Sequence, residues 1–309
     1  MTGTEGTRGL MARSESFKSL MAWGSSSMNG GYPNVGPPLP CNIRDQLQAA
    51  IHPLPYTHVA KGQLESYHSL IHMGVTTPKV VFDGGQASTA GPAPVKNLEG
   101  TPSHDKPVKN FSCHGKIAST PGWLRGTGKG YTWAPDDGRT RVKSGHFVSD
   151  HQKTVKEGTG GYLPHHILWV GKNNIYVNGG NDVMGDVNRM VAFAGGSGQC
   201  MVVGNWLTPQ DLDSGPRTTA GTKAVNEHQK WKYGVRFLDA NTLLTSEWGL
   251  SSPPVKGLNL LGRSDVRADI KRGHVPRALV YRDDMHLNGW GNLIITWAMI
   301  EKMKELEWL

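Results

Sequence analysis

Two residues near the end of the chain have the types and the spacing of an acid–base pair. Asp283 and His286 stand three residues apart, directly before a long amphipathic run that ends at Leu309. On a loop entering a helix, the carboxylate can reach back to one ring nitrogen of the histidine. It would then fix the ring tautomer and stabilise the imidazolium, which is the role of the acid in a Ser-His-Asp triad. The pair therefore predicts proton transfer to and from a nucleophile elsewhere in the chain.

A serine nucleophile is available near the N-terminus. Residues 24–30 read Gly-Ser-Ser-Ser-Met-Asn-Gly and follow a short apolar run, residues 20–23, that predicts a buried strand. A serine on a tight strand-to-helix turn projects its hydroxyl above the edge of a sheet, as nucleophile elbows do. The residues alone leave Ser25, Ser26 and Ser27 open as the nucleophile.

The order of these two segments resembles that of a known family. Gly-x-Ser near the start and Asp-x-x-His near the end are similar to the first and last blocks of the SGNH (GDSL-type) hydrolases. The spacing between the two glycines of the serine segment resembles the family's Gly-Asp-Ser-x-x-x-Gly and favours Ser26, although Ser25 stands where the family has Asp. The resemblance implies that Ser26, Asp283 and His286 are the catalytic residues.

Two further blocks of the family have counterparts between these ends. Residues 79–88 are a predicted strand running into a glycine turn, and the resemblance implies that the backbone N–H of Gly85 serves the oxyanion hole. Residues 166–174 are a predicted strand followed by Gly-Lys-Asn-Asn, similar to the family's Gly-x-Asn-Asp, which implies that Asn173 is the side-chain donor. With the backbone N–H of Ser26, these donors would converge where negative charge develops.

A second Gly-Gly-Asn-Asp sequence, at residues 179–182, competes with Asn173 for this role. It follows no strong strand pattern, and Asn181 has the character of a helix cap. The earlier block departs from the family only in having Asn174 where the family has Asp. We therefore expect Asn173 rather than Asn181 at the oxyanion.

Strand and helix patterns alternate regularly in the second half of the chain. Such alternation is typical of a parallel sheet covered on both faces, which places the site blocks at the carboxyl edge of its strands. The fold class predicted is α/β, a three-layer α/β/α arrangement with a mostly parallel sheet, similar to flavodoxin-like SGNH hydrolases. The predicted strands are 20–23, 80–82, 167–170, 201–203 and 235–238, and the predicted helices are 41–51, 61–73, 182–194, 220–233 and 287–308.

The domain organisation follows from composition. Residues 1–18 are polar and read as a loose leader, and residues 19–309 as one hydrolase-like domain. This domain is interrupted at about 86–162 by a stretch rich in Gly, Pro, Lys and His, in which Trp123, Tyr131 and Trp133 favour a packed loop-rich or small β insertion over disorder.

Charge and composition exclude several function classes. The 309 residues carry a formal net charge of +8, but Lys and Arg are scattered, so no nucleic-acid partner is expected. Three Cys and the scattered His residues lack metal-ligand spacing, so we expect neither a metal nor a cofactor. No signal peptide or membrane span is recognisable, which favours a cytoplasmic or virion-associated protein. The oligomeric state stays open.

The sequence therefore predicts a serine esterase acting through an acyl-enzyme on a small-molecule or glycan ester. The ten Trp and the polar insertion lean towards O-acetyl groups on a carbohydrate. The family resemblance also allows a lipase or thioesterase type of acyl hydrolase. The alternative from another class is a non-catalytic module of the same fold, serving as a binding or structural component of a virion or surface assembly.

Overall fold

The centre of the molecule is a five-stranded parallel sheet. The computed structural model describes residues 19–30, 41–87, 91–103, 106–158 and 161–309, so the predicted leader lies outside the described residues. The strand order is β12-β11-β10-β1-β2, and every pairing is parallel. The strands are β1 (Leu20–Gly24), β2 (Tyr56–Ala60), β10 (His165–Trp169), β11 (Cys200–Val203) and β12 (Phe237–Leu238).

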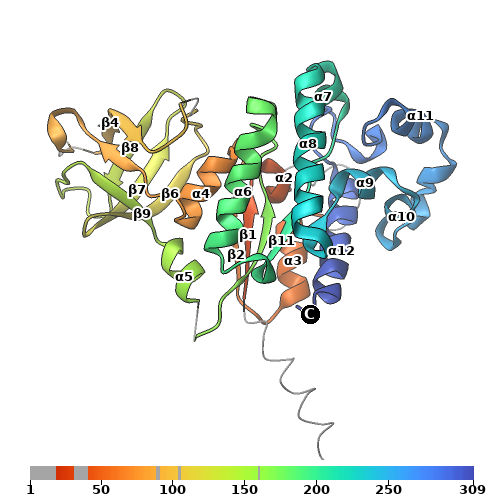
Figure 1. Ribbon diagram of the computed structural model, residues 1–309, viewed down its shortest axis with the longest axis horizontal. Helices are drawn as coiled ribbons and strands as arrows, with labels where there is room; N and C mark the ends of the chain where they lie inside the picture. The colour runs from red at the N-terminus through yellow and green to blue at the C-terminus, as the bar shows by residue number, and fades with distance from the viewer. Residues whose placement is uncertain (1–18, 31–40, 88–90, 104–105, 159–160) are drawn as a thin grey trace, which may run out of the picture.

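Helices cover both faces of this sheet, as Figure 1 shows. Alternate side chains of β1 enter two separate apolar clusters: Leu20 packs with α3 and α12, whereas Met21 packs with α4, α6 and α8. The prediction of an α/β fold with a parallel sheet and covering helices is thus confirmed. The longer helices are α3 (Ile43–Ile51), α4 (Ser66–Met73), α6 (Asn181–Phe193), α8 (Pro216–Tyr233), α11 (Ser264–Arg272) and α12 (Gly289–Glu305).

Short helices form most of the connections. They are α2 (Ser26–Asn29), α5 (His151–Glu157), α7 (Pro209–Asp213), α9 (Ala240–Thr245) and α10 (Glu247–Leu250), with 3-10 turns between them. In the described part of the chain, no helix combines the length and the apolar character needed to cross a bilayer.

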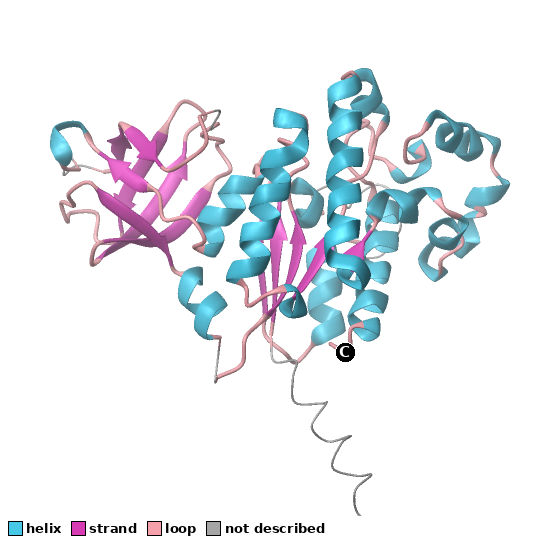
Figure 2. Cartoon of the chain, viewed as in Figure 1, coloured by secondary structure: helices cyan, strands magenta, loops and turns pink. Residues whose placement is uncertain are grey.

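A second sheet, antiparallel and seven-stranded, is inserted between α4 and α5 and lies on the left of Figures 1 and 2. We call residues 79–149 the β-domain. Its order is β4-β8-β7-β6-β9-β3-β5. Its strands are β3 (Lys79–Val81), β4 (Ala93–Val95), β5 (Asn97–Glu99), β6 (Ser112–Ile117), β7 (Thr120–Gly126), β8 (Tyr131–Pro135) and β9 (Gly145–Ser149).

The place of β3 corrects two expectations. The segment was predicted as a strand of the parallel sheet, but β3 pairs antiparallel with β5 and β9 and so belongs to the β-domain. The second sheet therefore begins at residue 79, before the expected start of the insertion at about 86. The strand that follows β1 in the parallel sheet is β2, which the sequence analysis missed.

The seam between α4 and the β-domain is aromatic. His68 and His72 of α4 lie against Phe111, with ring centroids 5.0 and 5.1 Å apart. Tyr131 of β8 meets the same phenylalanine edge-on at 5.8 Å. One apolar cluster thus runs from the parallel sheet through α4 into the β-domain, and it fixes the two parts against each other.

Candidate active site

Strand register brings three turns to one edge of the parallel sheet. Gly24 at the end of β1 lies opposite Ala60 of β2 and Trp169 of β10. The turns that follow these strands therefore start at the same level, at their carboxyl ends. Ser26 stands two residues past the end of β1, and Gly62 stands two residues past the end of β2.

The serine turn is tight because of its first glycine. A Cβ on Gly24 would lie 2.5 Å from both the Cβ of Met28 and the carbonyl oxygen of Trp169, so a side chain has no room there. Helix α2 runs from Ser26 to Asn29 and is followed by Gly30, whose φ of 59° is the left-handed conformation of a C-cap. Ser26 is thus the first residue of a helix, and its N–H has no partner within that helix.

A hydrogen-bonded chain joins the two ends of the sequence at this turn. The hydroxyl of Ser26 lies 2.9 Å from Nε2 of His286. The other ring nitrogen of His286, Nδ1, lies 2.7 Å from Oδ2 of Asp283. Ser25 and Ser27 are both buried, at 1% and 7% exposure, and the hydroxyl within reach of the imidazole is that of Ser26. The structure thus brings together the three residues that the sequence placed as a candidate triad.

Hydrogen bonds hold the loop that carries Asp283 and His286 in place. The N–H of Tyr281 donates to the carbonyl of His286 at 2.7 Å. Asn288 donates from Nδ2 to the carbonyl of Ala278 at 2.9 Å, while its Oδ1 accepts two backbone N–H groups in the first turn of α12, at 3.0 and 3.1 Å. Asn288 caps the helix and holds the loop to it, a role that the sequence analysis missed.

The electrostatics of the loop keep the carboxylate ionised. Partial burial by itself would raise the pKa of Asp283. Hydrogen bonds from the backbone N–H of His286, from its ring and from the N–H of Met285 outweigh that effect and hold the pKa below its usual value. An ionised Asp283 is the partner that an imidazolium at His286 requires.

Gly85 does not take part in this arrangement. It lies in the 3-10 turn Asp83–Gly85 after β3, in the β-domain, and its N–H donates to the carbonyl of Phe82 at 3.0 Å. The glycine beside the serine is Gly62, where an added Cβ would lie 3.9 Å from the Cβ of Ser26. The prediction failed because β3 looks locally like a strand of the parallel sheet, whereas β2 is polar.

Asn173 reaches the same edge from β10. Its Nδ2 donates to the carbonyl of Leu64, 2.8 Å away in the loop after β2. An amide nitrogen carries two hydrogens, so a second donor position remains. The neighbouring Asn174 is buried and bonds both the N–H and the hydroxyl of Ser66. The competing Asn181 lies in the first turn of α6, where its Nδ2 bonds the carbonyl of Asn178.

The space directly at the serine is small. A cavity of about 10 Å³ opens beside Ser26. It is bounded by residues that follow β1, by one residue that follows β11, and by residues of the C-terminal loop and α12. Trp206 follows β11 and Asn292 lies in α12; neither was recognised from the sequence. The lining residues are Ser26, Ser27, Gly30, Trp206, His286, Leu287 and Asn292.

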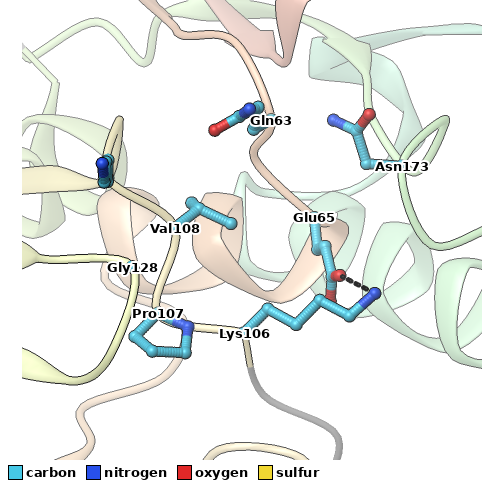
Figure 3. A pocket seen from close by; sticks show the side chains of 8 residues that line it. Gln63, Glu65, Lys106, Pro107, Val108, Gly128 and Asn173 are labelled. Carbon is cyan, nitrogen blue, oxygen red and sulfur yellow. Dashed lines mark ion pairs between the residues drawn. The ribbon is translucent and has the colours of Figure 1, made fainter.

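A larger groove, of about 640 Å³, lies between the loop after β2 and the β-domain, as Figure 3 shows. Its lining consists mainly of polar and charged side chains. The residues are Gln63, Glu65, Lys106, Pro107, Val108, Lys109, Gly128 and Asn173. Asn173 also borders a pocket of about 370 Å³ on its opposite side, towards α7 and α8.

The described histidines and cysteines form no recognisable metal centre. Across the described ranges, no three His, Cys, Asp or Glu side chains are grouped so as to hold a metal ion. Cys41, Cys113 and Cys200 are buried, and Cys113 and Cys200 are free thiols.

Comparisons with known proteins assign no family to this chain. No family model matches the chain, and no curated protein matches it. Among solved structures, the chain is similar to a member of the lipolytic protein G-D-S-L family from Veillonella parvula DSM 2008, over 93% of this chain and 97% of that one, with 11% identity and a TM-score of 0.42. A functional assignment therefore depends on the residues of the site itself.

Proposed function

We propose that this protein is a serine ester hydrolase of the SGNH type, with Ser26 as nucleophile, His286 as general base and Asp283 as the residue that orients the imidazole. The observation that carries the proposal is the continuous hydrogen-bonded chain from the Ser26 hydroxyl through both ring nitrogens of His286 to Asp283. Two residues 260 positions apart in the sequence meet at hydrogen-bonding distance, an arrangement that serves nucleophilic catalysis.

The first half of the reaction forms an acyl-enzyme. The oxygen of Ser26 attacks the ester carbonyl carbon while its proton passes to Nε2 of His286. Collapse of the tetrahedral intermediate breaks the bond to the alcohol oxygen, and the imidazolium gives its proton to that oxygen. The alcohol leaves, and the acyl group stays on Ser26.

The second half releases the acid. Water takes the place of the alcohol, His286 accepts one of its protons, and the water oxygen attacks the acyl carbon. The bond to Ser26 then breaks, and His286 returns the proton to the serine oxygen. Asp283 stabilises the imidazolium in both halves and does not itself become protonated.

The developing oxyanion needs donors at the same edge of the sheet. We assign this role to the N–H of Ser26, to the amide of Asn173 and, in place of Gly85, to the N–H of Gly62. The strand register supports the set, since all three follow the carboxyl ends of adjacent strands. Fixed donors of this kind act on the transition state more than on the substrate.

The size of the cavity at Ser26 favours a short acyl group. A volume of about 10 Å³ corresponds to about one water molecule, so it leaves no room for the long acyl chain of a lipase substrate. The polar groove beside the site supports a polar alcohol such as a sugar. The residues that line this groove include no tryptophan, so the Trp content gives no support to a glycan.

The proposal is tested by hydrolysis of 4-nitrophenyl acetate, followed by a series of longer acyl chains. Ser26→Ala is expected to abolish turnover, while Ser25→Ala and Ser27→Ala serve as matched controls that retain it. The rate should fall steeply from acetate to octanoate. If the wild type and Ser26→Ala are equally inactive on every ester, the chain is a non-catalytic module; if Ser25→Ala or Ser27→Ala is the inactive variant, the nucleophile is assigned wrongly.

A further inference from the structure

A segment of the β-domain reaches the turn that holds Gly62. A Cβ added at Gly62 would lie 3.3 Å from Nδ2 of Asn110 and 3.9 Å from the Cβ of Ser26. The amide of Asn110 and the Cβ of Ser26 therefore border the same small space beside Gly62. Asn110 is exposed, so its amide is accessible to a ligand bound at the serine.

This segment is held firmly in place. The hydroxyl of Tyr67 accepts the N–H of Lys106 at 3.0 Å and approaches its carbonyl at 3.2 Å. The N–H of Phe111 donates to the carbonyl of Val108 at 3.0 Å, and the ring of Phe111 is fully buried in the seam. Residues 106–111 are thus anchored at both ends, so Lys109 and Asn110 are presented on an ordered loop.

The groove that starts beside Asn173 has two walls of different origin. One wall is the segment after β2 with Gln63 and Glu65, and the other is the β-domain segment with Lys106, all labelled in Figure 3. Lys109 lines the same wall as Lys106. Its volume of about 640 Å³ lies within the roughly 300–1,000 Å³ typical of small-molecule sites. Because the groove runs from a proposed oxyanion donor towards the β-domain, it is placed to receive the alcohol part of the ester.

The charges along the groove do not cancel. The buried Glu65 faces Lys106, with Oε1 and Nζ 3.9 Å apart, and the same Nζ donates to the hydroxyl of Tyr176 at 2.9 Å. Lys109 has no ion-pair partner among the described residues. Its aliphatic chain lies over Gly128, where a Cβ would come within 3.1 Å of Cγ. The positive charge of Lys109 is therefore available to pair with an anionic group of a ligand.

From this arrangement we propose that the β-domain forms one wall of the substrate site, where Lys109 and Asn110 bind the alcohol part of an ester that carries an anionic group. The inference rests on the proposed esterase function for its catalytic consequence, but the binding it describes does not require turnover. A carboxylate and a phosphate present the same chemistry to Lys109, so the anion is named by its charge.

The experiment compares neutral and anionic acetyl esters of matched size. The probes are 4-nitrophenyl acetate, a mono-O-acetylated methyl glucoside, the corresponding methyl glucuronoside and the corresponding glucoside 6-phosphate. Lys109→Ala should raise KM about fivefold for the two anionic sugars, as expected for an exposed ion pair, and leave 4-nitrophenyl acetate unchanged. Lys109→Arg should restore the preference, and Lys129→Ala, an exposed lysine of the same domain, is the matched control.

Asn110→Ala tests the second contact. Loss of one hydrogen bond should raise KM about fivefold for all three sugar esters. The proposal is overturned if the wild type shows no preference for an anionic over a neutral sugar, or if Lys109→Ala lowers activity equally on every probe.

Calorimetry in the Ser26→Ala background separates this inference from the esterase proposal. The acetylated glucuronoside should bind Ser26→Ala and should bind about fivefold more weakly when Lys109→Ala is added. Weakened binding without any hydrolysis by the wild type would refute the esterase function and retain the site. Hydrolysis by the wild type with equal binding by both variants would retain the esterase function and refute the binding site at Lys109.

Discussion

Two regions of this molecule hold histidines in opposite settings. At the carboxyl edge of the parallel sheet, His286 lies between an ionised carboxylate and a hydroxyl. In the seam between α4 and the β-domain, His68 and His72 pack against Phe111. Burial lowers the pKa of each seam histidine to about 3, and each also feels the repulsion of a histidine neighbour.

The difference shows that surroundings, and not residue type, decide what a histidine does. A neutral ring among aromatic side chains contributes packing and a single hydrogen bond, as His72 does when Nε2 meets the carbonyl of Ser112 at 3.2 Å. A ring with a carboxylate behind it can accept a proton at moderate cost. His68 and His72 thus contribute to structure, and His286 in the C-terminal loop carries the proposed chemistry.

The largest expected effect separates the two settings by substitution. His286→Ala should lower kcat by at least about 10⁴-fold, because the general base is lost, and should leave urea unfolding nearly unchanged. His72→Ala should lower the unfolding free energy by about 2–4 kcal/mol through the cavity it leaves and keep kcat within a few fold. Measuring kcat and urea unfolding on both variants checks the contrast, and the opposite pattern would contradict it.

Asp283→Asn removes the charge behind the imidazole and little else. An Asn at this position retains an oxygen for the N–H groups of Met285 and His286, so the loop should keep its shape. We expect kcat to fall by about 10³- to 10⁴-fold because the tautomer is no longer fixed. Steady-state kinetics on 4-nitrophenyl acetate measures this, and a loss below about tenfold would mean that Asp283 does not orient the ring.

Asn173→Ala should have a smaller effect. Removing one oxyanion donor costs about 100- to 1,000-fold in kcat, with KM little changed. Asn181→Ala is the matched control and should behave as the wild type. Because Asn173 also bonds the carbonyl of Leu64, a urea titration accompanies the kinetics. Equal activity of the two variants would exclude Asn173 from the oxyanion hole.

The smallest effect concerns pH and stability. His68, His72 and His166 have folded pKa values lowered to about 3 by burial, so below the ordinary histidine value of about 6.5 the unfolded chain binds more protons than the folded one. Their contribution to stability is therefore complete above that value and is lost as the pH falls towards 3, by up to about 1.4 kcal/mol per histidine and pH unit.

Urea unfolding at pH 8, 7 and 5 measures this slope. The wild type should be equally stable at the two higher values and weaker at pH 5, and replacing His72 by Asn should reduce the slope. A stability that does not change between pH 7 and 5 would show that the seam histidines titrate normally.

Strong local patterns were sufficient for much of the fold. The apolar runs of β1, β10 and β11 and the amphipathic pattern of α12 were predicted close to their observed bounds. β2 was missed because it is a half-buried edge strand with polar Thr57 and His58. β3 was placed in the wrong sheet because a local pattern does not tell which strands will be its neighbours.

The prediction of the site has the same limit, because local patterns do not show which segments pack together. Ser26, Asp283 and His286 stand in short segments with a recognisable order, so the sequence could bring them together. Gly62 and Asn110 meet only through the packing of the β-domain against the loop after β2. Trp206 enters the cavity at the serine from a loop after β11, and no spacing in the sequence connects it with the serine segment.

The measurement that tests the central claim most directly is covalent labelling. An activated serine oxygen attacks the phosphorus of a fluorophosphonate and displaces fluoride, which leaves the phosphonyl group bound to the serine. Fragmentation of the modified peptide by tandem mass spectrometry then identifies the residue. We predict one adduct, on Ser26, formed in step with the loss of hydrolysis and absent from His286→Ala. An adduct on Ser25 or Ser27, or an active protein that forms no adduct, would contradict the account.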